Sequence, residues 1–204
     1  MAKIKFTKNE LKKQKDDLKR YTRYLPTLEL KKKQLLQEIN KIRRTMESLQ
    51  AEAARVERQV SAWAGLFAED VDFDQFFSVQ EIQTETGNIT GIDIPVYAGV
   101  AFEEAEYDFY TTPLWVDRAI EVCKEQIKRH AEAAVCRRQR EILQEELRIT
   151  IQRIKLFEEV KIPEARENIR VIQIFLGDQM TAEVVRGKIA KAKIERKKHE
   201  VSRV

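Results

Sequence analysis

The residues best suited to bind a metal ion in this chain are its two cysteines and two histidines. His130 lies seven residues after Cys123 and six before Cys136, so Cys123 and His130 could share one face of a helix. Structural zinc sites need four ligands at short, regular spacings. His199 is distant in sequence, and no fourth ligand follows such a spacing. We therefore expect no metal site, and both cysteines are most simply reduced, half-buried apolar residues.

Nucleotide chemistry is the next possibility, because Gly187-Lys188 matches two residues of a phosphate-binding loop. The loop also needs a glycine five positions earlier, and this chain has none there. No nucleophile paired with a base and no isolated pair of carboxylates is apparent. The many acids have Lys and Arg partners at helical spacing instead. We expect neither catalytic residues nor a cofactor.

Basic residues gather at the carboxyl terminus, where the last 19 residues hold eight of them against Glu195 and Glu200. Such a run can bind nucleic acid, a membrane surface or an acidic socket on a protein, or it can be a solvated tail. The aromatic residues that single-strand binders use for stacking are missing from it. The candidates for contact with a partner are Arg186, Lys188, Lys191, Lys193, Arg196 and Lys197.

The composition favours long helices as the elements that carry these residues. Charged residues make up 35% of the 204 residues and aromatic residues 8%, with six glycines and four prolines. The sequence has no uninterrupted apolar run of transmembrane length. The amino terminus has no apolar signal segment, so we expect a cytoplasmic protein.

The charge distribution divides the chain into three blocks. Residues 1–67 hold 17 Lys and Arg against 8 acids, residues 68–112 hold 11 acids and no base, and residues 113–204 hold 21 bases against 15 acids. We interpret these blocks as an amino-terminal coiled-coil helix, an acidic connecting insert, and a carboxy-terminal coiled-coil helix with a basic tip.

The first block carries a heptad pattern that never loses its register. Thr7 and Glu10 predict a capping box at its start, and Pro26 predicts a kink in the helix. Fifteen of 17 seam positions are apolar, as in a coiled coil. The seam consists of Leu11, Gln14, Leu18, Tyr21, Leu25, Leu28, Lys32, Leu35, Ile39, Ile42, Met46, Leu49, Ala53, Val56, Val60, Trp63 and Phe67.

The partner of this helix is the third block. Thr112-Pro113 predicts its start, Pro163 a kink and Gly177 an interruption. Because a short insert joins the two helices, they must lie antiparallel, with paired residue numbers adding up to about 180. The fold class is thus mainly α-helical: a long antiparallel two-helix coiled coil whose last ~30 residues, if helical, overhang by roughly 45 Å.

Within the acidic insert, residues 79–85 and 89–96 are two β-prone runs around Thr86-Gly87-Asn88, which predicts a β-hairpin turning at those three residues. Pro95 would restrict the second run to an edge strand or to the end of a strand.

Two leucines stand outside the seam. Leu30 and Leu36 fall at outward heptad positions. Isolated exposed leucines are common and usually need no explanation, but these two could instead contact a second protein on the side of the helix.

The two helices together resemble the D subunit of V-type and A-type rotary ATPases. The resemblance rests on residues 7–11 with Leu18, on the lysine- and leucine-rich run 28–36, and on residues 162–169 with Ile172 and Leu176. It implies a noncatalytic central rotor shaft that turns inside a catalytic head of A and B subunits. It also implies a small F subunit of the stalk on the side of the shaft, where Leu30 and Leu36 are candidates, and a funnel-shaped connecting subunit that leads to the membrane ring.

Two other classes stay open from the residues themselves. A prefoldin-like holdase chaperone also joins long helices through β-structure, but it needs apolar tips, and the tip here is rich in lysine. A nucleic-acid-binding coiled-coil arm fits the basic tail and not the acidic insert. From the family resemblance we expect a protein on the cytoplasmic face of a membrane, with no nucleic acid bound and no membrane-spanning segment.

Overall fold

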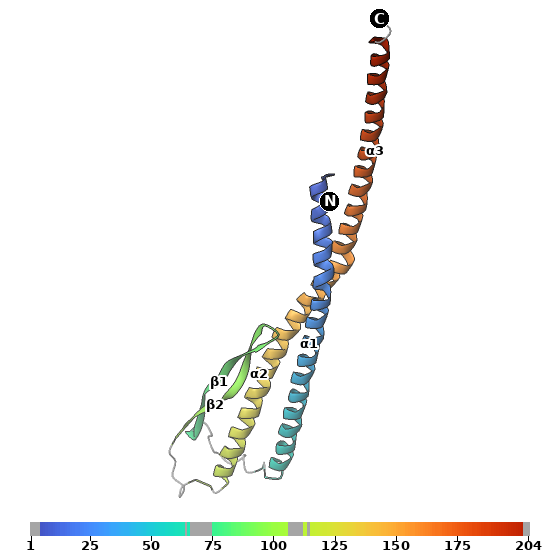
Figure 1. Ribbon diagram of the computed structural model, residues 1–204. Helices are drawn as coiled ribbons and strands as arrows, with labels where there is room; N and C mark the ends of the chain where they lie inside the picture. The colour runs from blue at the N-terminus through green and yellow to red at the C-terminus, as the bar shows by residue number, and fades with distance from the viewer. Residues whose placement is uncertain (1–4, 64, 66–74, 106–111, 114, 202–204) are drawn as a thin grey trace. The chain divides into compact units, whose positions relative to one another are not determined.

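The computed structural model describes residues 5–63, 65, 75–105, 112–113 and 115–201, with side chains up to residue 196. The order of elements is α1 (Lys8–Val60), β1 (Phe77–Ile89), β2 (Ile92–Glu104), α2 (Val116–Lys155), the π-helical turn η3 (Leu156–Lys161) and α3 (Ile162–Val201). These elements form two compact units, one of Met1–Glu29 with Ile151–Val204 and one of Leu30–Thr150. Figure 1 shows the elements by colour along the chain.

The amino end of α1 is capped in the way that its sequence predicts, although only in one direction. The Glu10 amide donates to Thr7 Oγ1 at 3.2 Å, which satisfies one of the orphan donors of the first turn. The reciprocal bond is not formed, because the Thr7 amide bonds to the Lys5 carbonyl and the Glu10 carboxylate accepts from Gln14. The helix then continues through Pro26 without a break.

The predicted seam of α1 is confirmed by burial. All 16 seam positions from Leu11 to Trp63 are buried or half-buried, and the residues between them are almost all exposed. Phe67, the last predicted position, lies outside the described residues. A period of 3.5 residues keeps one stripe facing the partner helix, so the heptad pattern specifies which face is covered.

In the unit Leu30–Thr150, α1 and α2 lie antiparallel. Lys31 Nζ pairs with Glu146 Oε1 at 2.7 Å, and Gln126 Nε2 donates to the Ala53 carbonyl at 3.4 Å. These partner numbers add up to 177 and 179, close to the expected 180. The core between the helices and the tip of the hairpin is formed by Leu35, Ile42, Met46, Ile94, Cys136 and Leu143.

In the other unit, the start of α1 pairs with η3 and α3 in the same antiparallel sense. The rings of Tyr21 and Phe157 are 5.2 Å apart, and Asn168 Nδ2 donates to Gln14 Oε1 at 3.3 Å. The irregularity predicted at Pro163 takes the form of a wider turn just before it, where the Ile162 amide donates five residues back, to the Phe157 carbonyl.

The predicted interruption at Gly177 is wrong, since α3 runs without a break from Ile162 to Val201. A glycine costs a helix interior only about 1 kcal/mol. Leu176, Gln179 and Met180 nearby are good helix formers, so this cost does not end the helix.

The β-hairpin is present, but its turn is not where the sequence placed it. The strands are 13 residues each, and the two-residue turn is Thr90-Gly91, both with positive φ, as a type I′ turn requires. Gly87 lies inside β1 instead. A Cβ on Gly87 would come within 2.6 Å of Val96 Cγ2, so glycine there serves close packing across the strands. Pro95 lies within β2 of this two-stranded sheet, where each strand is an edge.

Two predicted helix ends also shift. Regular α1 ends at Val60 rather than at residue 67, and α2 begins at Val116 rather than at Pro113. Val116 is fully buried against Phe77 and Ile120, so the helix starts where its first residue can pack under the hairpin.

Candidate partner-binding surfaces

The carboxy-terminal part of α3 is a single helix that no other described element of its unit covers. Near its beginning, the ring of Phe175 pairs with the ring of Phe6, just before α1, with centroids 5.0 Å apart. From residue 177 to residue 196 every residue is exposed. In Figure 1 this part of α3 extends beyond the beginning of α1. We call residues 177–201 the overhang.

The overhang carries the basic residues that the sequence singled out. Arg186, Lys188, Lys191, Lys193 and Arg196 are all exposed on it, and Lys197 follows, with its side chain outside the described part. Among the described residues no carboxylate lies within ion-pair distance of these bases. At about 100° per residue the bases point to several sides of the helix, so the structure brings them onto one rod and not into one patch.

Apolar side chains on the same rod were not recognised as exposed from the sequence. Between 49% and 60% of the residue surface remains accessible at Met180, Val184, Val185, Ile189 and Ile194. They too point to several sides. A helix that is apolar around its circumference is normally surrounded by other protein. One feature of the sequence does indicate this exposure: residues beyond about 172 have no heptad partner in the first helix.

Leu30 and Leu36 lie outward on α1, as their heptad positions predicted. Their exposed fractions are 57% and 40%, whereas Leu35 beside them is fully buried. Six residues correspond to about 120° around a helix axis. The two leucines therefore flank one side of α1 rather than forming one contiguous patch.

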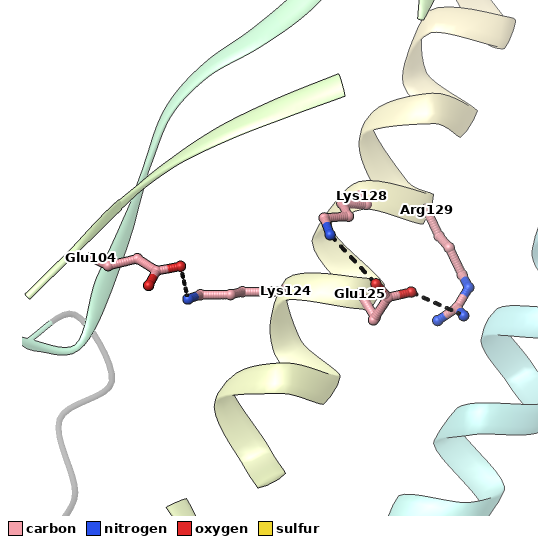
Figure 2. A network of polar contacts seen from close by, with 5 residues as sticks. All are labelled: Glu104, Lys124, Glu125, Lys128 and Arg129. Atoms are coloured by element: carbon pink, nitrogen blue, oxygen red, sulfur yellow. Dashed lines mark hydrogen bonds and ion pairs between the residues drawn. The ribbon is translucent and has the colours of Figure 1, made fainter. Parts of the chain in front are cut away.

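The hairpin is fastened to α2 at its base by a lysine that the sequence analysis missed. Lys124 Nζ pairs with Glu104 Oε1 at 2.6 Å and lies 5.5 Å and 5.9 Å from the ring centroids of Phe77 and Phe102. A cation between a carboxylate and two aromatic faces is held in place electrostatically. Figure 2 shows this pair beside a second group on α2, in which Glu125 contacts Lys128 and Arg129.

Arg129 extends that second group to the other helix. Its Nε lies 3.8 Å from Glu52 Oε2 on α1, and its Nη2 lies 3.5 Å from Glu125. One guanidinium nitrogen, Nη1, is buried without a hydrogen-bond partner among the described residues, and so is Gln126 Oε1 one turn away. These contacts position the helices relative to each other within this unit.

Along its length, β2 lies on α2. Gln139 Nε2 donates to the Pro95 carbonyl at 2.6 Å, and Ile94 is 3% exposed. Burial raises the pKa of the Tyr97 phenol, with Glu132 and Glu125 adding to the effect. The strands themselves hold five acids and no base over residues 77–104.

The cysteines lie in α2 as free thiols, Cys136 buried and Cys123 half-buried. Burial raises the pKa of both, which lowers their reactivity at neutral pH. Among the described residues no three His, Cys, Asp or Glu side chains are grouped so as to hold a metal ion. No helix in the described ranges carries an apolar stretch long enough to cross a bilayer.

Comparison with known proteins finds one family over most of the chain. The family model for the D subunit of ATP synthase matches residues 10–192. The V-type ATP synthase D subunit of Borreliella burgdorferi is 45% identical over 197 residues, which cover 97% of this chain and 98% of the relative. The proteins of the same name from Chlamydia caviae and Chlamydia felis are 37% and 36% identical over 98% of this chain and 97% of their own.

Proposed function

Since the chain belongs to the family of ATP synthase D subunits, we propose that it is the central rotor shaft of a V-type rotary ATPase. In that function it couples ATP hydrolysis or synthesis in a catalytic head to transport of protons or sodium ions across a membrane. The observation that carries the proposal is the overhang: a lone helix, basic and apolar on several sides, at the end of a paired helix. The relatives matched above offer no support for a holdase or a nucleic-acid-binding arm.

A shaft must resist sliding and twisting of one helix against the other, and each unit contains contacts that do this. Gln14 and Asn168 form a polar pair in one seam, and Lys31 and Glu146 form an ion pair beside the other. A polar pair at a seam is satisfied in one register only, so a slip by one turn would leave its groups unpaired. The apolar seam supplies stiffness and the polar pairs supply the register.

The family resemblance suggests the partners, and the exposed surfaces offer a place for each of them. The overhang, with Arg186, Lys188, Lys191, Lys193, Arg196 and Lys197, enters the bore of the head formed by the A and B subunits. Leu30 and Leu36 contact the small F subunit of the stalk. The acidic insert points toward the funnel-shaped connecting subunit and the membrane ring, so the protein works on the cytoplasmic face of the membrane. The chain itself is noncatalytic in this arrangement.

The test of this function is affinity purification of the tagged chain from native membranes. We expect ATPase head subunits and a small stalk subunit to co-purify with it in constant proportion. Recovery of the chain alone, or with nucleic acid whose binding weakens with salt, would reject the rotor function.

The head contact is tested by deleting residues 187–204. All described side chains in this segment are exposed, so the deletion should leave the remaining helices and binding of the F subunit intact. Association with the head and coupled ATPase activity should fall. A matched control replaces Lys8 and Lys12, exposed bases on α1, with glutamine. Unchanged assembly after the deletion would show that the overhang is only a solvated extension.

The small-subunit contact is tested by replacing Leu30 and Leu36 together with alanine. Since both are exposed, we expect folding to be preserved and affinity for the F subunit to fall by about tenfold, equivalent to ~1.4 kcal/mol. Tyr24→Ala, another exposed large side chain on α1, serves as the comparison. Equal affinity of the double variant and the wild-type chain would remove these leucines from the interface.

A further inference from the structure

The outer strand of the hairpin, β1, is exposed to an unusual degree. All nine residues from 78 to 86 are exposed on both faces of the sheet, whereas most residues of β2 are buried or half-buried. β2 therefore lies between α2 and β1. In Figure 1 the hairpin runs alongside α2. Within the described part of the chain, no hydrogen bond joins residues 78–86 to any element other than β2.

An edge of this kind is normally blocked in natural proteins. Short length, proline, lysine, bulges or a covering helix prevent pairing with another chain. β1 has 13 residues without proline or lysine. Its own bulge lies near the base of the hairpin, at the register shift between Val79 and Glu81. From Glu81 to Thr86 no extra residue interrupts β1, because the second bulge is on β2, between Tyr97 and Gly99.

We propose that the outer edge of β1 between Glu81 and Thr86 accepts an extended, basic segment of a neighbouring subunit as a third strand. Main-chain hydrogen bonds would supply the affinity, and alternate side chains the selectivity. Exposed Val79 and Ile82, at 46% and 43% accessibility, offer apolar contacts to that segment. The proposal rests on the rotor function, because the neighbour is a subunit of the same complex.

Charge identifies the occupant. Residues 77–104 carry five acids and no base, and Glu81 and Glu85 lie on the edge strand itself. A second copy of β1 would place like charges opposite one another, which destabilises a strand pair. A segment rich in lysine or arginine would place opposite charges there. Since backbone pairing holds two segments in a fixed relation, the donor must turn with the shaft and belong to the rotor.

The main experiment measures amide hydrogen exchange at single-residue resolution, in the purified chain and in the assembled complex. In an antiparallel ladder, alternate amides of β1 point toward β2 and the others point outward. We expect the outward amides between Glu81 and Thr86 to slow by at least about tenfold in the complex, as for a newly formed backbone hydrogen bond. The inward amides should change little. Equal exchange in both samples, or equal slowing of all β1 amides, would overturn strand addition.

A charge-reversal pair supplies the second measurement. Glu85→Lys is compared with Glu103→Lys, which changes another exposed acid that lies on β2 rather than on the free edge. When each variant competes with the wild-type chain for assembly, we expect Glu85→Lys to be recovered roughly fivefold less at low salt. Glu103→Lys should be recovered almost normally. Equal losses would mean that only the overall charge of the insert matters, and the proposal would fail.

Further outcomes distinguish a failure of the strand-addition proposal from a failure of the proposed rotor function. Protection of β1 by self-association of the purified chain would replace the basic segment with a second copy and overturn the proposal. If the wild-type chain recovers no head subunits, the rotor function itself fails. If it recovers them while the outward amides of β1 stay unprotected, only the strand-addition proposal fails.

Discussion

Replacing Leu35 with alanine should strongly destabilise the unit Leu30–Thr150, whereas the same change at the adjacent Leu36 should not. Leu35 is fully buried and packs in the cluster with Ile42, Met46 and Leu143, while 40% of Leu36 is exposed. Truncation of a buried leucine removes its transfer free energy and leaves a cavity, a loss of about 2–5 kcal/mol. For Leu36 the loss should be below roughly 1 kcal/mol.

Both tryptophans of the chain, Trp63 and Trp115, fall within this unit, so their fluorescence during denaturant unfolding reports on it selectively. A loss of ~3 kcal/mol shifts the ratio of folded to unfolded molecules by more than about a hundredfold. The slope of the free energy of unfolding against denaturant concentration should be the same in the variants and the wild-type chain. A constant slope indicates that stability has changed and that the surface exposed on unfolding has not. Equal losses at Leu35 and Leu36 would refute the assignment of the seam face.

Three further predictions concern the helix of the overhang, an ion pair and catalysis. Gly177→Ala adds a Cβ with no atom within 4 Å, so it should favour the helix by up to about 1 kcal/mol, measured as slower amide exchange around that residue. Glu167 accepts two hydrogen bonds from Arg170, which lower its pKa. The pair is therefore present above the ordinary pKa of a glutamate and is lost as the pH falls through the lowered value. Arg170→Gln should raise the pKa of Glu167 in an NMR titration, and an unchanged value would contradict the pairing. The purified chain should hydrolyse no ATP, and turnover that follows the protein peak through repurification would oppose a noncatalytic function.

The position of the hairpin turn could not be predicted from the sequence alone. Gly followed by Asn between two β-prone runs is a hairpin-turn signal, and for that reason the sequence predicts the turn around Gly87-Asn88. In the structure the glycine is needed for the close approach of Val96 across the strands. Asn88 instead accepts the Gly91 amide, at 3.0 Å, and donates to Asp93. One local signal is compatible with both arrangements, and the packing between strands selects one.

Some residues of the candidate partner-binding surfaces could also be found from the sequence, and others could not. The bases of the overhang and the outward leucines could be found from their types and heptad positions, because both are properties of one helix. Lys124 could not be found, since its importance depends on Phe77, Phe102 and Glu104, which approach it only when the hairpin packs on α2.

Periodicity, chain length and composition were enough to establish the seam of α1, the antiparallel sense of the helix pair and the acidic hairpin between the helices. These properties act locally along one helix or limit how two helices can be joined. Packing in three dimensions was needed to place the turn at Thr90-Gly91, the start of α2 at buried Val116, the π-helical turn before Pro163 and the open edge of β1. The hairpin turn, the helix start and the open edge depend on contacts between separate elements, where several local conformations have similar free energies and packing selects among them.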